Sequence, residues 1–330
     1  MNDDRDGTPP LILVTGAGER DAPPGLSSLA SRARLAFAET PDDIAARIGD
    51  ADVIFAWRPE RATLEPNLSR ARRLRWIQTA SAGVDRLLFP ALVEADVVVT
   101  NARGVFDDAM AEYAIACILV FAKDLAATIA DSRRAVWHYR YTEPVQGRSL
   151  LVLGPGPIGT AVARRASALG MRVEAIASAG RPASAPYDRV RGPDALGDAL
   201  GAADYVVNTL PLTERTRHLL DDAAFEAMRP TARLVNLGRG ATVDEAALVR
   251  ALRRGAIAGA ALDVFETEPL PSDSPLWRMP NVIVSPHMSG DLEGWEERVV
   301  DVFARNLDRF LRREPLSNVV DKSRGYVPSG

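Results

Sequence analysis

The chain has a single cysteine among its 330 residues, Cys117, so an internal disulfide is excluded. This residue lies in the apolar run IACILV, which indicates a buried, unreactive thiol rather than a catalytic nucleophile. Long apolar runs are also missing, since the longest, from Ala114 to Ala122, is far short of the roughly 20 residues that cross a bilayer. We therefore expect no transmembrane helix.

Neither sign of charge dominates, because 40 Lys and Arg stand against 44 Asp and Glu, a net charge of −4. The chain thus lacks the basic field that attracts nucleic acid or anionic lipid. A local cluster of arginines has no aromatic stacking partners and is interpreted as a solvated helix face: Arg70, Arg72, Arg73 and Arg75. The start, MNDDRDGTPP, is acidic where a secretory signal is basic and then apolar. We expect a cytoplasmic protein that binds neither nucleic acid nor membrane.

Hydrophobic residues make up 47% of the chain and charged residues 25%, the balance of a globular protein. At about 150 residues per domain, the length corresponds to two domains. Short apolar runs alternate with helical patterns, which predicts the α/β class with parallel sheets. The first series of expected strands is 11–14, 34–37, 53–55, 75–78 and 97–100. The second, a unit of six strands, is 149–153, 172–176, 205–209, 233–237, 259–264 and 282–284.

The segments that follow each series of strands predict how the domains are arranged. Residues 107–137 are long enough for two helices, and a last helix is expected over 292–312, where apolar residues recur at helical spacing. That helix needs a surface to cover, and we expect it to return to the first unit. The first domain would then comprise residues 1–102 and 291–330, with the second inserted as residues 103–290.

A glycine-rich turn follows the expected strand 149–153 and opens a helix: Gly154-Pro155-Gly156-Pro157-Ile158-Gly159. Glycines in this pattern allow a tight turn and the close approach of a pyrophosphate to a helix N-terminus. The pattern therefore predicts dinucleotide binding, and the alternative is an ordinary tight turn between strand and helix. Pro155 and Pro157 each remove a backbone N–H, so the amides near Ile158 and Gly159 would hold more of the phosphate.

The tip of the next strand bears on the choice of cofactor. A carboxylate at that position binds the ribose 2′-hydroxyl of NAD, but the tip here reads Ala-Ser178-Ala-Gly-Arg181, and Glu174 falls inside the strand. Ser178 and Arg181 could instead meet a 2′-phosphate, which favours NADP(H) over NAD(H). The alternative is that Arg181 is a solvated loop charge and that the site accepts both cofactors.

Three polar side chains follow consecutive expected strands: Arg239, Glu268 and His287. Ligands of open α/β sheets bind beyond the carboxyl ends of the strands, so these groups would converge at one edge. Arginine can bind a carboxylate through two parallel hydrogen bonds, and histidine can donate a proton near neutral pH. A glutamate on the other imidazole nitrogen would fix the tautomer. This set suits the reduction of a 2-oxo acid and requires no metal.

The two other histidines are expected to be structural. His218 follows Thr-Arg in what reads as the start of a helix, and His138 lies in the aromatic segment WHYRY. Neither is expected to have a carboxylate partner at a comparable strand end.

Several motifs along nearly the whole chain resemble the D-isomer-specific 2-hydroxyacid dehydrogenases. They are SAGVD at 81–85, TNARGVFDDAMAEYAIA at 100–116, LPLT at 210–213, VNLGRGATVD at 235–244, GAIAGAALDVFETEPL at 255–270, SPLW at 274–277 and PNVIVSPHMSG at 280–290. The resemblance implies a Rossmann domain inserted into a smaller flavodoxin-like substrate domain, with a cleft between them and a homodimer built on the inserted domain and the long helix around Glu112.

The same resemblance assigns roles to residues. Arg239, Glu268 and His287 would be the family's catalytic arginine, glutamate and histidine, with Arg239 also binding substrate. The backbone at Ala82 and Gly83 would hold the substrate carboxylate. The residues placed beside the cofactor, besides the glycine turn and its strand tip, are Leu210, Pro211 and Asp263.

The sequence therefore predicts an NAD(P)-dependent reductase of a small 2-oxo acid such as glyoxylate or hydroxypyruvate. Two alternatives stay open: a related dehydrogenase acting on phosphoglycerate, formate or a larger 2-oxo acid, and a dinucleotide sensor without catalytic activity. Trp57 and Arg58, which follow an expected strand, either line the substrate pocket or belong to a surface loop.

Overall fold

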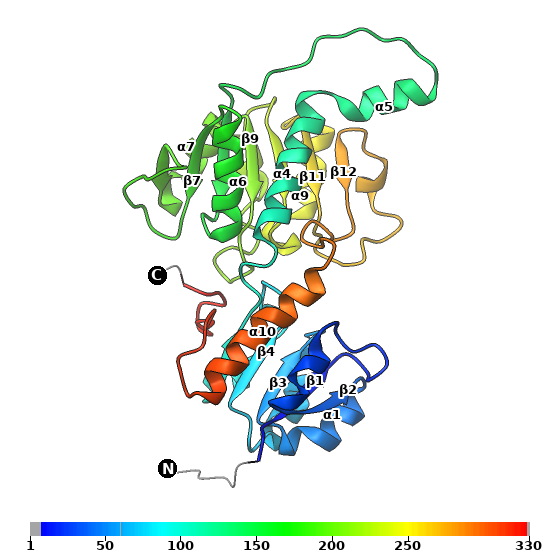
Figure 1. Ribbon diagram of the computed structural model, residues 1–330. Helices are drawn as coiled ribbons and strands as arrows, with labels where there is room; N and C mark the ends of the chain where they lie inside the picture. Colours follow the sequence, from blue (N-terminus) through cyan, green and yellow to red (C-terminus); the bar gives the residue numbers. More distant parts are fainter. Residues whose placement is uncertain (1–7, 60, 329–330) are drawn as a thin grey trace. The chain divides into compact units, whose positions relative to one another are not determined.

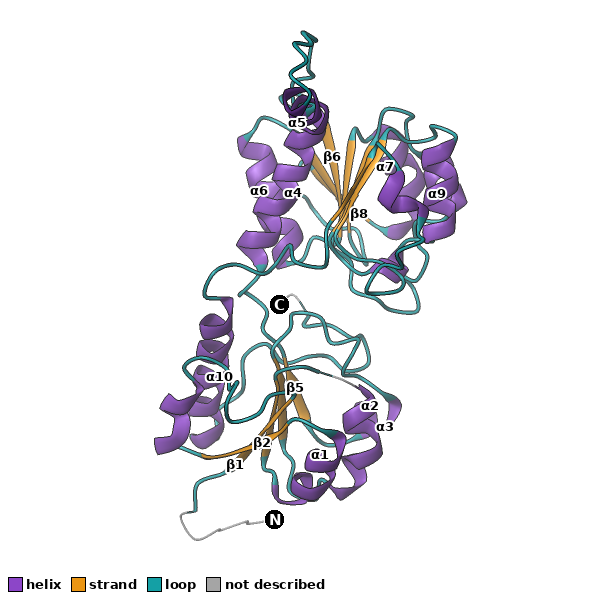
Figure 2. Ribbon diagram, turned by 90° about the vertical axis from the view of Figure 1, so that its right-hand side faces the viewer, coloured by secondary structure: helices purple, strands orange, loops and turns teal. Residues whose placement is uncertain are grey.

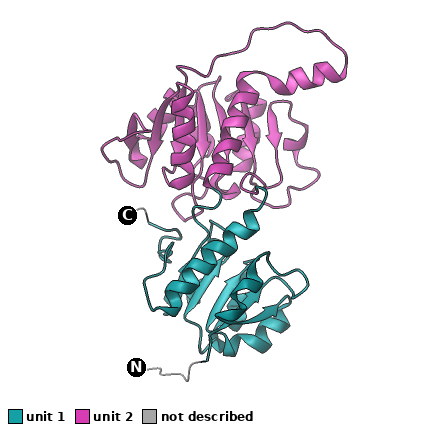
Figure 3. Cartoon of the chain, viewed as in Figure 1, with its two compact units in different colours: residues 1–106, 292–330 teal, residues 107–291 magenta. Residues whose placement is uncertain are grey.

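The computed structural model describes residues 8–59 and 61–328. The described chain forms two compact units (Figure 3): unit 1 comprises residues up to Phe106 and from Leu292 onward, and unit 2 comprises Asp107–Asp291. The sequence predicted crossings near Asn101 and Gly290, slightly before these boundaries.

Unit 1 is built on a five-stranded parallel sheet in the order β2-β1-β3-β4-β5. Its strands are β1 (Leu11–Thr15), β2 (Arg34–Ala38), β3 (Val53–Ala56), β4 (Trp76–Thr79) and β5 (Val98–Thr100). The strand order is that of flavodoxin-like folds. Figure 2 shows the short helices α1 (Pro41–Arg47), α2 (Arg61–Leu64) and α3 (Pro90–Glu94) on one face of this sheet.

Helix α10 (Trp295–Leu311) covers the other face of the unit 1 sheet (Figures 1 and 2). Its apolar side chains recur at helical spacing, so one side of the helix is buried. The ring of Phe303 stacks on Phe55 with centroids 4.3 Å apart and on Trp76 at 5.1 Å. The carboxyl-terminal segment therefore completes the hydrophobic core of the domain formed by the beginning of the chain.

Unit 2 is built on a seven-stranded parallel sheet in the order β12-β11-β10-β9-β6-β7-β8. Its strands are β6 (Ser149–Leu153), β7 (Arg172–Ile176), β8 (Arg189–Arg191), β9 (Tyr205–Asn208), β10 (Arg233–Asn236), β11 (Gly259–Leu262) and β12 (Val282–Val284). The order changes direction between β6 and β9, which is the topology of a Rossmann fold.

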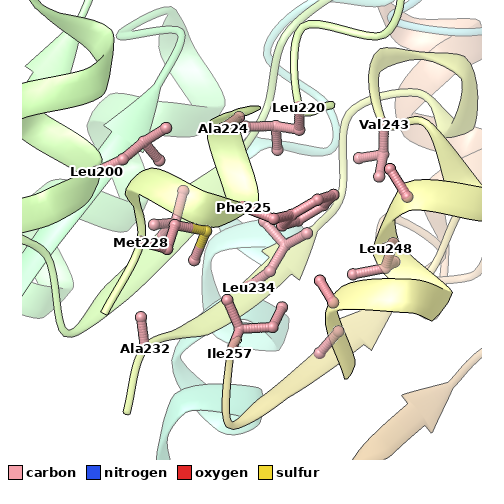
Figure 4. Packing of buried hydrophobic residues seen from close by; sticks show 14 of the residues in the cluster. Leu200, Leu220, Ala224, Phe225, Met228, Ala232, Leu234, Val243, Leu248 and Ile257 are labelled. Carbon is pink, nitrogen blue, oxygen red and sulfur yellow. The ribbon is translucent and has the colours of Figure 1, made fainter. Parts of the chain in front are cut away.

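Helices cover both faces of the unit 2 sheet (Figure 2). One face carries α4 (Asp107–Ala122) and α6 (Pro157–Ala168), whose small residues pack on the strands. The other carries α7 (Leu196–Ala202), α8 (Asp222–Ala227) and α9 (Glu245–Arg253). Figure 4 shows Phe225 of α8 among the apolar residues of this second layer. Its side chain is fully buried, so its truncation to alanine would cost about 3–5 kcal/mol.

Two features of the sequence were interpreted wrongly. The second unit has seven strands rather than six, because Arg189–Arg191 pairs with β7 as β8. These three residues, RVR, are too few and too polar to show a hydrophobic pattern.

The arginine cluster is not a helix face. Arg73 and Arg75 lie beyond the 3₁₀ helix Glu65–Arg70, and both form ion pairs with the buried Asp52, at 3.2 and 3.8 Å.

No single described helix is long and apolar enough to cross a membrane. Helices α4 and α5 (Leu125–Arg133) together reach that length, but they bend by 66° at the break between them. Much of α4 is buried in unit 2, Cys117 included. One or two such helices occur in the cores of water-soluble proteins.

Candidate active site

Arg239, Glu268 and His287 follow β10, β11 and β12, which are neighbours in the unit 2 sheet. Since parallel strands bring their carboxyl ends to one edge, the three loops begin at the same side of the domain. The sequence analysis expects these three side chains to meet at one edge of the sheet, and they can do so only because β10, β11 and β12 are neighbours.

Glu268 and His287 are in direct contact. The imidazole Nδ1 lies 2.8 Å from Oε2 of Glu268, and Oε1 of the same carboxylate accepts a hydrogen bond from the backbone amide of Phe265 at 3.1 Å. The carboxylate is thus fixed by its own turn, so that Nδ1–H can donate to it. This hydrogen bond holds the imidazole in one orientation and fixes its tautomer.

The loop that carries His287 is held by Asp263, a nearly fully buried residue. Oδ1 of Asp263 accepts hydrogen bonds from the Ser285 hydroxyl at 2.6 Å and from the Met288 amide at 2.9 Å, and Oδ2 accepts one from the Ser289 amide at 2.9 Å. His287 has a φ of +53°, which is uncommon for a residue other than glycine. These three bonds stabilise the unusual backbone around it.

Sequence reasoning missed this role of Asp263 and assigned it, by resemblance, only a contact with the cofactor. A buried aspartate directly after β11, next to the strand that leads into SPHMS, is the signal that could have found it. Burial also raises the pKa of the nearby Asp291 carboxyl, and the charge of His287 acts in the opposite direction. A second carboxyl group therefore lies within electrostatic range of the imidazole.

Arg239 is half-buried in the loop after β10. Its Nη1 donates to the carbonyl of Gly238 at 2.8 Å, and its own carbonyl accepts a hydrogen bond from the Thr242 hydroxyl at 2.6 Å. The next residue, Gly240, has no space for a side chain, because a Cβ there would lie 1.9 Å from the carbonyl carbon of Phe265. The loop that carries Arg239 therefore presses closely on the turn that carries Glu268.

The glycine turn has the geometry that a pyrophosphate needs. Gly154 has a φ of +90°, and a Cβ on Gly159 would lie 2.3 Å from the carbonyl oxygen of Gly154. At Gly156, by contrast, a Cβ would meet no atom within 4 Å, so the backbone before α6 is open to a ligand. Pro157 is the first residue of α6, a position where the missing N–H has no helical partner. The turn therefore fits a dinucleotide.

The other residues predicted to bind the cofactor lie at the same edge of the sheet. Leu210 and Pro211 follow β9, which adjoins β6 at the point where the strand order changes direction. Ser178 and Arg181 are exposed beyond β7. Glu174 forms ion pairs with Arg189 and Arg191 of β8, at 3.5 and 3.9 Å. Its carboxylate is thus occupied within the sheet.

The predicted carboxylate-binding residues, Ala82 and Gly83, lie in unit 1 just after β4. Their loop is fixed through its carbonyl groups: Nδ2 of Asn101 donates to Ala82 at 2.5 Å, and the hydroxyl of Ser81 donates to Gly83 at 2.6 Å. Arg239, Glu268 and His287, the residues predicted to be catalytic, lie in unit 2.

The prediction for His218 was wrong in two respects. It lies in a turn with a φ of +50°, and α8 begins only at Asp222. It also has a carboxylate partner next to a strand end, since its Nε2 lies 2.9 Å from Oε1 of Glu266. His138 pairs with Asp131, at 3.3 Å. Among the described residues, no group of three or more His, Cys, Asp or Glu side chains is arranged to hold a metal ion.

Comparisons with known proteins agree with this geometry. Residues 115–289 match the family described as D-isomer specific 2-hydroxyacid dehydrogenase, NAD binding domain. A glyoxylate reductase of Korarchaeum cryptofilum is 33% identical over 84% of this chain and 84% of that protein. The chain belongs to the D-isomer-specific 2-hydroxyacid dehydrogenase family.

Two further members of the family bear on cofactor and substrate. A D-3-phosphoglycerate dehydrogenase of Methanocaldococcus jannaschii is 31% identical over 94% of this chain but 59% of its own length. A D-isomer specific 2-hydroxyacid dehydrogenase of Xanthobacter autotrophicus, solved with NADPH, has a TM-score of 0.80 and 30% identity, covering 97% of this chain and all of that one. This 2-hydroxyacid dehydrogenase is therefore an oxidoreductase with an NAD(P)-binding Rossmann domain.

Proposed function

We propose that the protein reduces a small 2-oxo acid with NADPH, using Arg239, Glu268 and His287. The observation that carries this proposal is the 2.8 Å contact between Nδ1 of His287 and Oε2 of Glu268, beside the strand that positions Arg239. Such a pair prepares an imidazole to give up a proton from its other nitrogen.

Each residue has a distinct task. The guanidinium of Arg239 binds the substrate carboxylate and polarises the neighbouring carbonyl. Nε2 of His287 holds the proton that the carbonyl oxygen takes up, a step worth roughly 10² to 10⁴ in rate. Glu268 keeps the imidazole oriented and in one tautomer, while Asp263 fixes the loop. When bound, the reduced nicotinamide supplies the hydride.

The cofactor site supports a preference for NADP(H) over NAD(H). The open backbone at Gly156 and the start of α6 receive the pyrophosphate, with Ile158 and Gly159 offering amides. Beyond β7, Arg181 and Ser178 face solvent without a carboxylate beside them in the stretch 177–181. A guanidinium at this position accommodates a 2′-phosphate. The NADPH bound to the Xanthobacter relative is consistent with this choice.

Glyoxylate and hydroxypyruvate are the substrates we propose. The indole of Trp57, at the end of β3, stacks on that of Trp295 with centroids 5.3 Å apart and planes 6° apart. Because β3 and β4 pair in register, with Ala56 opposite Thr79, Trp57 follows the strand next to the one that leads to Ala82 and Gly83, and Trp295 of α10 stacks on it. Large side chains there favour small substrates. The glyoxylate reductase of Korarchaeum supports the same class.

A homodimer in the cytoplasm is also part of the proposal. Helix α5 and the loop after it form an arm that extends beyond the sheet of unit 2 (Figure 1). Apolar side chains of this arm are exposed, among them Trp137 at 98% and Tyr141 at 90%. Clusters of exposed aromatic residues mark protein interfaces. Light scattering coupled to gel filtration should give the mass of a dimer, and a Trp137→Arg variant should shift it toward the monomer.

A substrate panel tests the enzymatic proposal. Oxidation of NADPH and of NADH is followed at 340 nm with glyoxylate, hydroxypyruvate, pyruvate, phenylpyruvate and a buffer blank. We expect the highest kcat/KM with NADPH and one of the first two acids. Turnover only with 3-phosphohydroxypyruvate would favour the phosphoglycerate dehydrogenase alternative. Cofactor binding without turnover of any acid would favour a dinucleotide sensor.

A further inference from the structure

His218 also pairs with a carboxylate, but it lies outside the proposed catalytic trio. Its Nε2 lies 2.9 Å from Oε1 of Glu266, and that same oxygen accepts a hydrogen bond from the amide of Glu245 at 3.2 Å. In return, the amide of Glu266 donates to Oε2 of Glu245 at 3.3 Å. One carboxylate oxygen therefore connects the turn of His218, the turn after β11 and the start of α9.

The backbone of His218 is fixed in the same place. Its amide donates to the carbonyl of Ala241 at 2.9 Å, and the amide of Leu220 donates to the carbonyl of Thr242 at 3.1 Å. Figure 4 shows Leu220 and Val243 in the same buried cluster as Phe225 and Leu248. The φ of +50° at His218 is unusual for a non-glycine residue, so this anchored backbone determines where the imidazole points.

The three segments that meet here are those that carry the proposed active-site residues. Leu210 and Pro211 precede His218 in the loop after β9, Arg239 precedes Ala241, and Glu268 lies two residues after Glu266. We propose that His218 is a positioning residue, which fixes the turn of residues 265–268 against the loop of Arg239 so that Glu268 meets His287. This inference rests on the proposed function for its catalytic consequence, but the contact itself is independent of it.

Glu245 and Glu266 are two carboxylates on adjoining turns, and burial together with the charge of Glu266 raises the pKa of Glu245. A histidine N–H directed at Glu266 offsets this accumulation of negative charge. Exposed ion pairs contribute little to stability, so the geometry favours a role in orientation over a role in folding.

The test compares His218→Ala with His218→Gln, because a glutamine amide can still donate a hydrogen bond to Glu266. Arg254→Ala is the control, as it removes another exposed side chain of unit 2 that pairs with a carboxylate, here Glu226 at 3.3 Å. We expect His218→Ala to lower kcat about tenfold, as a small displacement of a catalytic group can, while KM for NADPH and the melting temperature stay close to wild type. His218→Gln should restore most of the activity, and Arg254→Ala should leave kcat unchanged.

A double-mutant cycle with Glu266→Ala assigns the effect to the pair. The two single variants and the double variant should have similar kcat, because residues that act through one contact are not additive. Equal kcat for wild type and His218→Ala, or a loss that His218→Gln does not reverse, would overturn the proposal.

Hydrogen–deuterium exchange separates this inference from the proposed function. Amides of residues 239–243 and 265–268 should exchange faster in His218→Ala than in wild type, and this measurement needs no substrate. Faster exchange in a protein that turns over no 2-oxo acid would leave the contact intact and reject the proposed function. Unchanged exchange in an active enzyme would reject the role of His218.

Discussion

The carboxylate of Asp263 accepts hydrogen bonds from the backbone amides of Met288 and Ser289, each at 2.9 Å. These are the two residues directly after His287, so a buried side chain at the end of β11 sets the position of an imidazole in the loop after β12. Asp263 therefore affects both the stability of this loop and the proton transfer that we propose for His287.

Replacing Asp263 with asparagine should therefore impair catalysis without removing a catalytic group. The aspartate accepts hydrogen bonds from two backbone amides and one hydroxyl through its two oxygens. An asparagine has one acceptor oxygen and an NH₂ group, so at least one of these buried donors would lose its acceptor. We expect kcat to fall about tenfold or more and the melting temperature to fall with it. Steady-state kinetics and thermal unfolding check this. Wild-type kcat in Asp263→Asn would show that the loop does not depend on this residue.

His287→Gln should abolish most turnover. Glutamine can keep a hydrogen bond to Glu268 but cannot release a proton near neutral pH, so we expect kcat to fall by roughly 10² to 10⁴. The affinity for NADPH, measured by fluorescence titration, should stay close to wild type because the cofactor residues are unchanged. Full turnover in this variant would rule out the proposed acid.

Arg239→Lys should weaken the use of the 2-oxo acid, although the charge is kept. A lysine lacks the planar pair of donors that matches a carboxylate, and a hydrogen bond to a charged group is worth about 1.5–3 kcal/mol. We expect kcat/KM for the acid to fall about 10- to 100-fold, with little change in KM for NADPH. A variant as active as wild type would contradict a direct contact with substrate.

Arg181→Ala tests the choice of cofactor. If its guanidinium binds a 2′-phosphate, KM for NADPH should rise about tenfold, whereas KM for NADH, which has no such phosphate, should change little. Arg172→Ala, an exposed arginine at the start of β7, is a suitable control. A parallel change with both cofactors would show that Arg181 does not discriminate between them.

Cys117 should resist alkylation in the folded protein. Burial raises the pKa of this thiol to about 12, and the thiolate is the reactive form. At pH 8 the thiol is therefore almost entirely protonated as well as shielded. Iodoacetamide should label it only after denaturation, as mass spectrometry would detect. Rapid labelling of the native protein would contradict the buried position.

The sequence predicted the parts of the fold that depend on local pattern. Strands such as Ser149–Leu153 and Arg172–Ile176 have the predicted bounds, because buried parallel strands are continuous apolar runs. β8 was missed because its three residues, RVR, derive their strand character from pairing with β7. Local pattern carries no information about such a partner.

The candidate site shows the same division. Placing Arg239, Glu268 and His287 after neighbouring strands was possible from the sequence, because strand ends of a Rossmann sheet share an edge. The hydrogen bonds of Asp263 and the pairing of His218 with Glu266 were not predictable in this way. They join residues 22 to 48 positions apart in sequence through turns whose backbone is fixed only in the assembled fold. His218 itself was taken for the start of a helix because its positive φ leaves no mark in the sequence.

Transfer of deuterium from the cofactor to the product tests whether the protein reduces a 2-oxo acid by hydride transfer. The enzyme is incubated with NADPH deuterated at both C4 positions and with hydroxypyruvate, and the glycerate formed is analysed by NMR and chiral chromatography. We expect D-glycerate with one deuterium at C2, and no such product from His287→Gln on the same timescale. Glycerate without deuterium at C2, or the L isomer, would contradict it.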